Sequence, residues 1–341
     1  MDKVKSLLPG KLPNDVLKDL LARFATDDPR VIVGPGVGSD AALIDMGGSY
    51  LVAKTDPVTF ATDRIGWYAV HVNANDIACC GGDPRWFLAT LLLPEQGTTV
   101  ELVEDIMSQI ANACADVGAS LCGGHTEITR GLDRPLVVGL MLGEVAPTDA
   151  LSTANAQVGD VLILTKGIAI EGTSILAREF SECLGAVDAD VVESARAFLD
   201  DPGISVLRDA RIARHAGGVH ALHDPTEGGI SQALYELASA AEVGVAVRFD
   251  DIVVLEECRA ICDVLDIDPL GLIASGALLV AAAADRAGAV VVALEAEGIA
   301  ARPIGEVVHA SEGVTLRRGG STEPLAVFAR DELASVLARI S

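Results

Sequence analysis

Five acidic residues stand where apolar segments of this sequence end or pause, and such positions often bind ligands. They are Asp40, Asp56, Asp76, Glu127 and Asp224. In mixed α/β folds, backbone donors and helix N-termini are free at strand ends, so ligands gather there. Four of the five are aspartates, and Mg²⁺ binds carboxylates together with substrate phosphates. We predict that these four aspartates hold a divalent cation. Hydrogen bonds from backbone N–H groups are the alternative that would satisfy them without a metal.

Asp76 is the most informative of the four because it interrupts an apolar helix. A helix that begins near Asp63 places Ile65, Ala69, Val72 and Asp76 at the spacing i, i+4, i+7, i+11, which is one helix face. A carboxylate on a buried face needs a partner, because burying an unpaired charge is costly. The spacing therefore predicts a buried carboxylate with a cation or a set of hydrogen-bond donors beside it.

Glycine turns, two lysines and one asparagine supply candidate contacts to a polyphosphate. Gly123 and Gly124 would let the backbone approach phosphates closely, and Lys11 follows a Pro-Gly turn that could place it over them. Lys166 precedes an expected helix N-terminus, and Asn75 offers amide donors to a phosphate or a base. The sequence contains neither a Walker motif nor a Gly-x-Gly-x-x-Gly between a strand and a helix. A single glycine turn is therefore weak evidence for a phosphate site.

The composition fits a two-domain protein with an aliphatic core. The chain has 341 residues, of which 50% are apolar and 4% aromatic, and its net charge is −24. This length predicts about two domains, and a strongly acidic chain repels a phosphate backbone, so nucleic acid is not expected as a partner. The sequence has no apolar run of membrane length and no N-terminal signal. Its seven cysteines form no disulfide or zinc pattern. We expect a cytoplasmic protein with no membrane contact.

Strands and helices alternate along the chain, and a polar stretch at 147–158 separates two halves. Apolar periodicity predicts a helix near 14–24, another at 98–118 and strands within 31–46 and 49–60. The segment 119–129 is expected to be a strand that runs into a glycine turn. The second half repeats strands, turns and helices as an α/β layer. We place the domains at 1–148 and 149–341.

Five sequence segments, in order, resemble one known family. They are GKLP, GVGSDAALID, KTDPVTF with the following IGWYAVHVNANDIACCGGDPRW, GGHTEIT, and HDPTEGG. This order is similar to the aminoimidazole ribonucleotide (AIR) synthetase superfamily, whose members include PurM, HypE, selenophosphate synthetase and thiamine-monophosphate kinase. The resemblance spans nearly the whole chain. Its nearest branch is the HypE-like, AIR-synthase-related proteins, because HDPTEGG is similar to their Asp-x-Thr-x-Gly-Gly turn.

The resemblance implies an α+β fold of the PurM type with two domains. The N-terminal α/β domain would bind ATP and metal and would form a barrel-like core with a second subunit, which implies a homodimer. The C-terminal domain would be an α/β sheet covered by helices. Carried over by motif, Asp40, Asp56, Asp76 and Asp224 would hold Mg²⁺. Gly123, Gly124 and Thr126 would line the phosphates, and Lys11 and Asn75 stay the further candidates that the residue types gave.

The activity implied is ATP-dependent activation of an amide or carbamoyl-type oxygen, or transfer of a phosphoryl group. His125, Glu127 and Lys166 are the candidates for the acceptor side, and an unknown small molecule or carbamoyl-type group is the expected acceptor. Three features depart from HypE: no cysteine follows Cys262, Glu127 replaces a lysine, and Ser275 replaces a glutamate. These departures put the HypE dehydration of a C-terminal thiocarbamate in doubt.

Two alternatives to this activity remain open. One is a small-molecule kinase similar to thiamine-monophosphate kinase, which would release ADP and a phosphorylated acceptor. The other is a nucleotide-binding partner of a hydrogenase-maturation complex that has no turnover. An enzyme is our main hypothesis.

Overall fold

A computed structural model describes residues 7, 10–24 and 27–340 of the chain. The first half contains, in chain order, α1 (Asn14–Phe24), β1 (Val31–Val33), β2 (Ala42–Asp45), β3 (Tyr50–Val58), α2 (Ile65–Cys79), β4 (Asp83–Pro94), α3 (Val100–Val117), β5 (Ser120–Thr129) and β6 (Leu136–Val145). The predicted helices near 14–24 and 98–118 and the strands within 31–46 and 49–60 are confirmed.

The second half continues the alternation of strands and helices. It contains β7 (Val161–Thr165), α4 (Ile170–Glu179), α5 (Ala189–Ala197), α6 (Leu207–Ala216), β8 (Val219–His223), α7 (Gly229–Ala241), β9 (Gly244–Arg248), α8 (Glu256–Leu265), β10 (Leu279–Ala282), α9 (Ala287–Ala296), β11 (Ala301–Val308), β12 (Val314–Arg318), β13 (Ser321–Pro324) and α10 (Glu332–Ile340).

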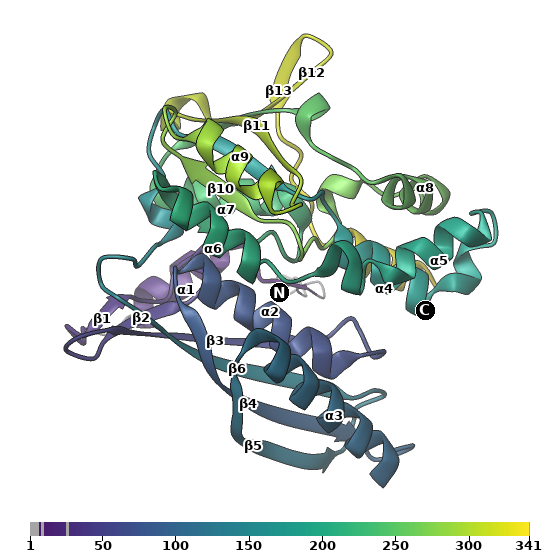
Figure 1. The fold of residues 1–341 in the computed structure, drawn as a ribbon. Coiled ribbons are helices and arrows are strands. Elements are labelled where there is room, and N and C mark those ends of the chain that lie inside the picture. The colour runs from purple at the N-terminus through teal and green to yellow at the C-terminus, as the bar shows by residue number, and fades with distance from the viewer. Residues whose placement is uncertain (1–6, 8–9, 25–26, 341) are drawn as a thin grey trace, which may run out of the picture.

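The first sheet has the strand order β1-β2-β3-β6-β4-β5 within the described residues. Its strands are antiparallel except for β4 and β5, which run parallel. Helices α2 and α3 lie together over one face of this sheet (Figure 1). In the single chain this sheet is open, and its edge strands among the described residues are β1 and β5.

The second sheet has the order β13-β12-β9-β11-β7-β10-β8. Alternate residues of its central strands point to opposite faces, as strand geometry requires. On one face, Leu162 and Leu279 pack with Leu234 of α7. On the other face, Ile163 packs with Val290 of α9, and α6 lies beside α9. Helices therefore cover both faces of the second sheet.

Helix α2 lies between the first sheet and the C-terminal half of the chain (Figure 1). All of its residues are buried except Trp67. A helix that is buried on every side belongs in a core, and α2 contributes to the packing of both halves. Asp76 is only 3% exposed, so the prediction of a buried carboxylate on this helix is confirmed.

The strand expected in 119–129 is confirmed, but the glycine turn is wrong, because Ser120–Thr129 form one continuous strand, β5. Gly124 has φ +148, and a Cβ atom there would lie 2.0 Å from the backbone oxygen of Ala89 on β4. Only glycine fits at such a close approach of two backbones. The glycine signal in the sequence therefore reflects strand pairing at this position.

The two sheets with their covering helices form the mixed α+β architecture that was predicted. Among the described residues, no helix combines the length and the hydrophobicity that crossing a bilayer requires.

Candidate functional site

The four predicted aspartates line one cavity of about 370 Å³ between the two halves of the chain. The other charged residues that line it are Lys11, Lys54, His223 and Glu236. When all are ionised, three cationic side chains face five carboxylates. The cavity thus has an excess of two negative charges, which a divalent cation would neutralise.

Separate elements deliver these carboxylates to the cavity. Asp40 follows the turn between β1 and β2, Asp56 lies on β3, Asp76 lies in the last turn of α2, and Asp224 directly follows β8. Asp40, Asp76 and Asp224 are buried, whereas the side chain of Asp56 is 35% exposed. The cavity therefore forms only when the first sheet, α2 and the second sheet are all in place.

Lys54 is the cation nearest to the buried end of this cluster. It lies two residues before Asp56, so both side chains project from the same face of β3. Its Nζ lies 3.1 Å from Asp76 Oδ1 and 3.5 Å from Asp56 Oδ2. Burial opposes the charged lysine, but Asp76 and Asp56 raise its pKa above the usual value. Lys54 is therefore an ammonium ion that partly neutralises the cluster.

His223 is the second buried cation. Its Nδ1 lies 2.5 Å from Asp40 Oδ1, and its Nε2 lies 3.1 Å from Glu236 Oε2. Burial alone would lower the pKa of the imidazole, but Asp40 and Glu236 raise it well above its usual value. Both ring nitrogens are therefore donors, and neither is free to bind a metal ion. Asp40 also accepts a hydrogen bond of 2.9 Å from Thr153 Oγ1.

Two carboxylate oxygens of the cluster have no hydrogen-bond partner among the described residues, namely Asp76 Oδ2 and Asp224 Oδ2. Burial is the main reason why the pKa of Asp224 rises to about 7, and Asp40 adds to the effect. Burial likewise raises the pKa of Asp76, although Lys54 opposes the shift. Asp40, His223 and Asp224 approach within 4.8 Å of one another, but both His223 nitrogens are engaged with Asp40 and Glu236, so only the carboxylate oxygens are available as ligands. The free oxygens and the negative excess fit an oxygen-liganded divalent cation.

Lys11 lies at the mouth of the cavity. Its Nζ donates a 3.0 Å hydrogen bond to Thr226 Oγ1 and lies 3.5 Å from Glu236 Oε1. Its backbone N–H donates to Glu227 Oε1 at 2.8 Å. The lysine side chain is 45% exposed, so its ammonium group is accessible to an anionic ligand that enters the cavity.

Two predicted site residues, Asn75 and Lys166, form their hydrogen bonds outside the aspartate cavity. Asn75 donates to the backbone oxygen of Ile204 at 2.8 Å and accepts from the backbone N–H of Val206 at 2.9 Å, so it ties α2 to the second half of the chain. Lys166 Nζ donates to the backbone oxygen of Ser205 at 2.7 Å and lies 3.4 Å from Asp209 Oδ2. Their predicted roles in nucleotide binding and catalysis stay predictions.

The predicted residues of segment 123–127 lie on β5, at the edge of the first sheet that is farthest from the second sheet (Figure 1). Every residue from 120 to 128 is exposed. His125 Nε2 lies 3.1 Å from Glu127 Oε2, and Thr129 Oγ1 donates to Glu127 Oε1 at 2.6 Å. Both partners keep the pKa of Glu127 below its usual value, the hydrogen bond from Thr129 most of all. A single chain does not bring these residues to the aspartate cavity.

Three charged residues of the cavity were not predicted from the sequence: Lys54, His223 and Glu236. Lys54 could have been found, because strand alternation places it on the face of Asp56. His223 directly precedes Asp224, but neighbours on a strand normally face opposite sides, so its sequence position gave no signal. Glu236 lies on α7 and meets His223 only in the tertiary structure.

The sequence matches two family descriptions over most of its length. Residues 38–145 match the N-terminal domain of AIR synthase related proteins, and residues 157–317 match their C-terminal domain.

Similar proteins include two curated relatives and a solved structure. A putative hydrogenase expression/formation protein of Methanocaldococcus jannaschii is 28% identical and covers 80% of each chain. The carbamoyl dehydratase HypE of Rhizobium leguminosarum bv. viciae is 31% identical over 80% of this chain and 77% of its own. The crystal structure of the hydrogenase maturation protein HypE in complex with ATP superimposes with a TM-score of 0.71 at 24% identity. It covers 96% of this chain and 100% of that one. This last likeness describes the fold.

Proposed function

The chain belongs to the AIR synthase related family, and on that premise we propose that it is an ATP- and Mg²⁺-dependent enzyme. Its reaction would activate an amide or carbamoyl-type oxygen, or transfer a phosphoryl group to an acceptor. The names of its HypE relatives support this reaction class and a place in a hydrogenase-maturation complex.

The observation that carries the proposal is the aspartate cavity with its two unpartnered carboxylate oxygens. A buried carboxylate oxygen without a partner costs about 1–3 kcal/mol, which a fold tolerates where a ligand supplies the missing contact. Asp76 and Asp224 are the residues that would hold Mg²⁺ most directly, and Asp56 and Asp40 would complete the oxygen ligands. When bound, the metal would offset the charge of the phosphate oxygens.

The chain's own residues would position the reacting groups. Lys11 would contact the phosphates, since its ammonium group is half-exposed above the metal ligands. In the transfer step, an acceptor oxygen would attack the γ-phosphorus, and the bond from that phosphorus to the bridging oxygen would break to release ADP. His223 would hold Asp40 in place through its 2.5 Å contact. Catalysis would then rest on positioning and charge compensation.

A homodimer would give the β5 residues a role in the same reaction. The edge strand is exposed along its length, and a second copy that pairs with it would bury Gly123, Gly124 and Thr126 against its own first sheet. The phosphate-binding role predicted for those residues, and the acceptor role of His125 and Glu127, would then be performed across the subunit interface.

The test is thermal stability with ATP and Mg²⁺, compared between the wild type and Asp76→Ala. At a ligand concentration one hundred times its dissociation constant, binding adds about 2.7 kcal/mol to the free energy of unfolding. We expect this gain in the wild type and its loss in the variant. Asp263→Ala removes an exposed aspartate on α8 and should keep the full gain. A wild type that gains no stability from any nucleotide would refute the proposal.

Product analysis separates the two reaction types. A kinase would form ADP and a phosphorylated acceptor, whereas activation of a carbamoyl-type oxygen would release free phosphate with a dehydrated product. A protein that gains stability from ATP and Mg²⁺ but forms neither product with carbamoyl-type acceptors would instead be a nucleotide-binding maturation partner.

A further inference from the structure

The four aspartates of the cavity differ in how the chain holds their carboxylates. Asp40 lies within hydrogen-bond distance of His223 through one oxygen and accepts from Thr153 through the other. Asp76 Oδ1 accepts a 3.1 Å hydrogen bond from Lys54 Nζ. These two carboxylates are therefore oriented by charged or hydroxyl donors.

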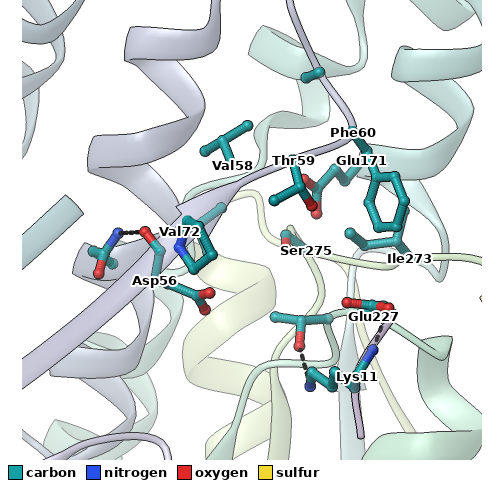
Figure 2. Close-up of a pocket in the computed structure, with 14 residues that line it drawn as sticks. Lys11, Asp56, Val58, Thr59, Phe60, Val72, Glu171, Glu227, Ile273 and Ser275 are labelled. Atoms are coloured by element: carbon teal, nitrogen blue, oxygen red, sulfur yellow. Dashed lines mark hydrogen bonds between the residues drawn. The ribbon is translucent and has the colours of Figure 1, made fainter. Parts of the chain in front are cut away.

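Asp56 and Asp224 have fewer partners. The backbone oxygen of Asp56 accepts from Asn73 Nδ2 at 3.2 Å, and its partly exposed carboxylate extends from β3 (Figure 2). Asp224 is only 2% exposed, yet a single hydrogen bond reaches its carboxylate from the described residues. The donor is Cys79, whose Sγ lies 3.7 Å from Asp224 Oδ1. Because a buried carboxylate needs partners, this thiol is the group that sets the orientation of Asp224.

Helix α2 places the thiol beside the carboxylate. Cys79 is the last residue of α2 and lies three residues after Asp76, so both side chains project from one face of the helix. The helix contacts β8, and Asp224 directly follows that strand. The end of the helix is tied to the start of the second half, because the backbone N–H of Leu151 donates to the backbone oxygen of Cys80 at 3.0 Å. The thiol therefore has a fixed place.

The surroundings of Cys79 make it a donor. Its side chain is fully buried and packs with Leu222 of β8 and with Leu278. A thiol in such a setting keeps its proton at neutral pH, and an ionised carboxylate can only accept. The S–H group therefore donates to Asp224 Oδ1. The other oxygen, Oδ2, has no hydrogen-bond partner among the described residues, and Asp224 lines the aspartate cavity.

We propose that Cys79 is a positioning residue for the metal site. Its S–H group holds Oδ1 of Asp224 and thereby leaves Oδ2 directed to the divalent cation. The thiol acts through Asp224 and does not itself bind the metal. The inference rests on the proposed function, because it takes Asp224 as a ligand of Mg²⁺.

Mn²⁺ binding to the full chain without nucleotide tests this, measured from the electron paramagnetic resonance signal of the free ion. Mn²⁺ prefers the same oxygen ligands as Mg²⁺. Cys79→Val fills a similar space without a donor, and it should weaken Mn²⁺ binding about tenfold, as the loss of a group that orients a metal ligand does. Cys79→Ser keeps a donor and should bind within about threefold of the wild type.

Cys114→Val is the matched control. Cys114 is also a buried cysteine, but it lies on α3 in the core of the first half, outside the aspartate cavity. This variant should bind Mn²⁺ as the wild type does. If Cys79 only fills space, both valine variants change the melting temperature and neither changes the affinity for Mn²⁺.

The infrared S–H stretching band supplies a second readout that a space-filling role would not move. Subtracting the spectrum of Cys79→Val isolates the band of Cys79. Mg²⁺ withdraws electron density from the carboxylate and makes it a weaker acceptor, so the band should shift to higher frequency when Mg²⁺ is added. Asp224→Asn should shift it in the same direction without metal, because a neutral amide oxygen is also a weaker acceptor. The comparison with Asp224→Asn needs no cysteine variant.

The inference is overturned if Cys79→Val binds Mn²⁺ as tightly as the wild type, if the wild type binds no Mn²⁺, or if the S–H band stays in place in either comparison. The gain in stability from ATP and Mg²⁺ is measured on the same samples. A normal gain with Mn²⁺ binding that does not depend on Cys79 overturns only this inference. Mn²⁺ binding that depends on Cys79, without a gain from any nucleotide, overturns only the proposed function.

Discussion

The aspartate cavity and strand β5 carry similar residue types but differ in how they are completed. The cavity is buried and formed by one chain, which brings its carboxylates together with Lys54 and His223. Strand β5 carries a histidine, a glutamate and two glycines, yet both of its faces and one edge are open. Polar residues in sequence motifs can therefore belong either to a site within one chain or to a surface that another molecule completes.

Strand β5 has an open, unprotected edge in the single chain. Exposed edge strands invite pairing with another strand, and proteins normally protect them. Leu121 and Ile128 are 41% and 64% exposed on this strand. These features support the homodimer that we propose, in which the β5 edge is covered by a second copy.

Lys54→Met should produce the largest effect, in the buried cavity. Removing this lysine leaves Asp76 without its ion-pair partner, so the free energy of unfolding in the absence of metal should fall by about 3 kcal/mol. Adding Mg²⁺ should recover part of this loss if the aspartates bind the metal. Chemical denaturation with and without Mg²⁺ measures both effects.

A matched control for that experiment is Lys166→Met. Lys166 is also buried and paired with an aspartate, Asp209, but it lies outside the aspartate cavity. Its loss should destabilise the protein equally with and without Mg²⁺. Recovery of both variants by Mg²⁺, or of neither, would contradict the assignment of the metal to the cavity.

Asn75→Ala tests whether the asparagine belongs to the site or to the framework. The substitution leaves the backbone groups of Ile204 and Val206 without partners, which should cost about 2–3 kcal/mol. Because its amide nitrogen and oxygen both bind backbone groups of the second half, the stability gained from ATP and Mg²⁺ should stay as in the wild type. Asn112→Ala, at an exposed position on α3, is the control. If Asn75→Ala loses the stability gained from ATP and Mg²⁺ while Asn112→Ala keeps it, the predicted contact between Asn75 and the nucleotide is supported.

The pH dependence of stability should reveal Glu171. Burial raises its folded pKa to about 7, with Asp331 and Asp56 adding to the shift, so the folded state holds a proton that the unfolded state has released. Its contribution to stability therefore falls as pH rises from about 4.5 to about 7, by up to about 1.4 kcal/mol per pH unit. Glu171→Gln should lose this dependence. Parallel stability curves for the two proteins over this range would show that the carboxyl does not titrate there.

Ile128→Asp on β5 should have the smallest effect on stability, within about 0.5 kcal/mol, because the side chain is exposed in the single chain. Its effect should appear instead in the molecular mass measured by light scattering, which should fall from that of a dimer to that of a monomer. Val292→Asp, at another exposed apolar position, should remain dimeric. An unchanged mass for Ile128→Asp would mean that β5 is not the dimer contact.

Most helices and strands could be predicted from the sequence, because the residues that begin, end and pattern them lie close together in the chain. Helix α3 is an example: Thr99 accepts a hydrogen bond from the backbone N–H of Leu102, and Gly118 ends the helix at φ 76. The burial of Asp76 also followed from spacing along one helix. Both rest on residues within a few turns of one another, which sequence periodicity reports directly.

The partners of the aspartates could not be predicted, because they depend on contacts distant in sequence. Asp40 and His223 meet across 183 positions, and no local pattern records such a pair. The expectation of a turn at Gly124 was wrong for a different reason. A glycine required for the close pairing of two strands looks, in sequence, like a glycine required for a phosphate turn.

The position of Lys54 has a consequence for how the protein would take up a metal. Its ammonium group already forms ion pairs with Asp56 and Asp76 and offsets part of their charge, so the folded chain carries its own counter-ion. Loading Mg²⁺ would then be an exchange of one cation for another, with the lysine side chain swinging away or turning to the phosphates. Such an exchange weakens metal affinity in the absence of nucleotide, because the metal must displace a partner that cannot diffuse away. The nucleotide, by attracting the released lysine, would make metal and ATP bind together.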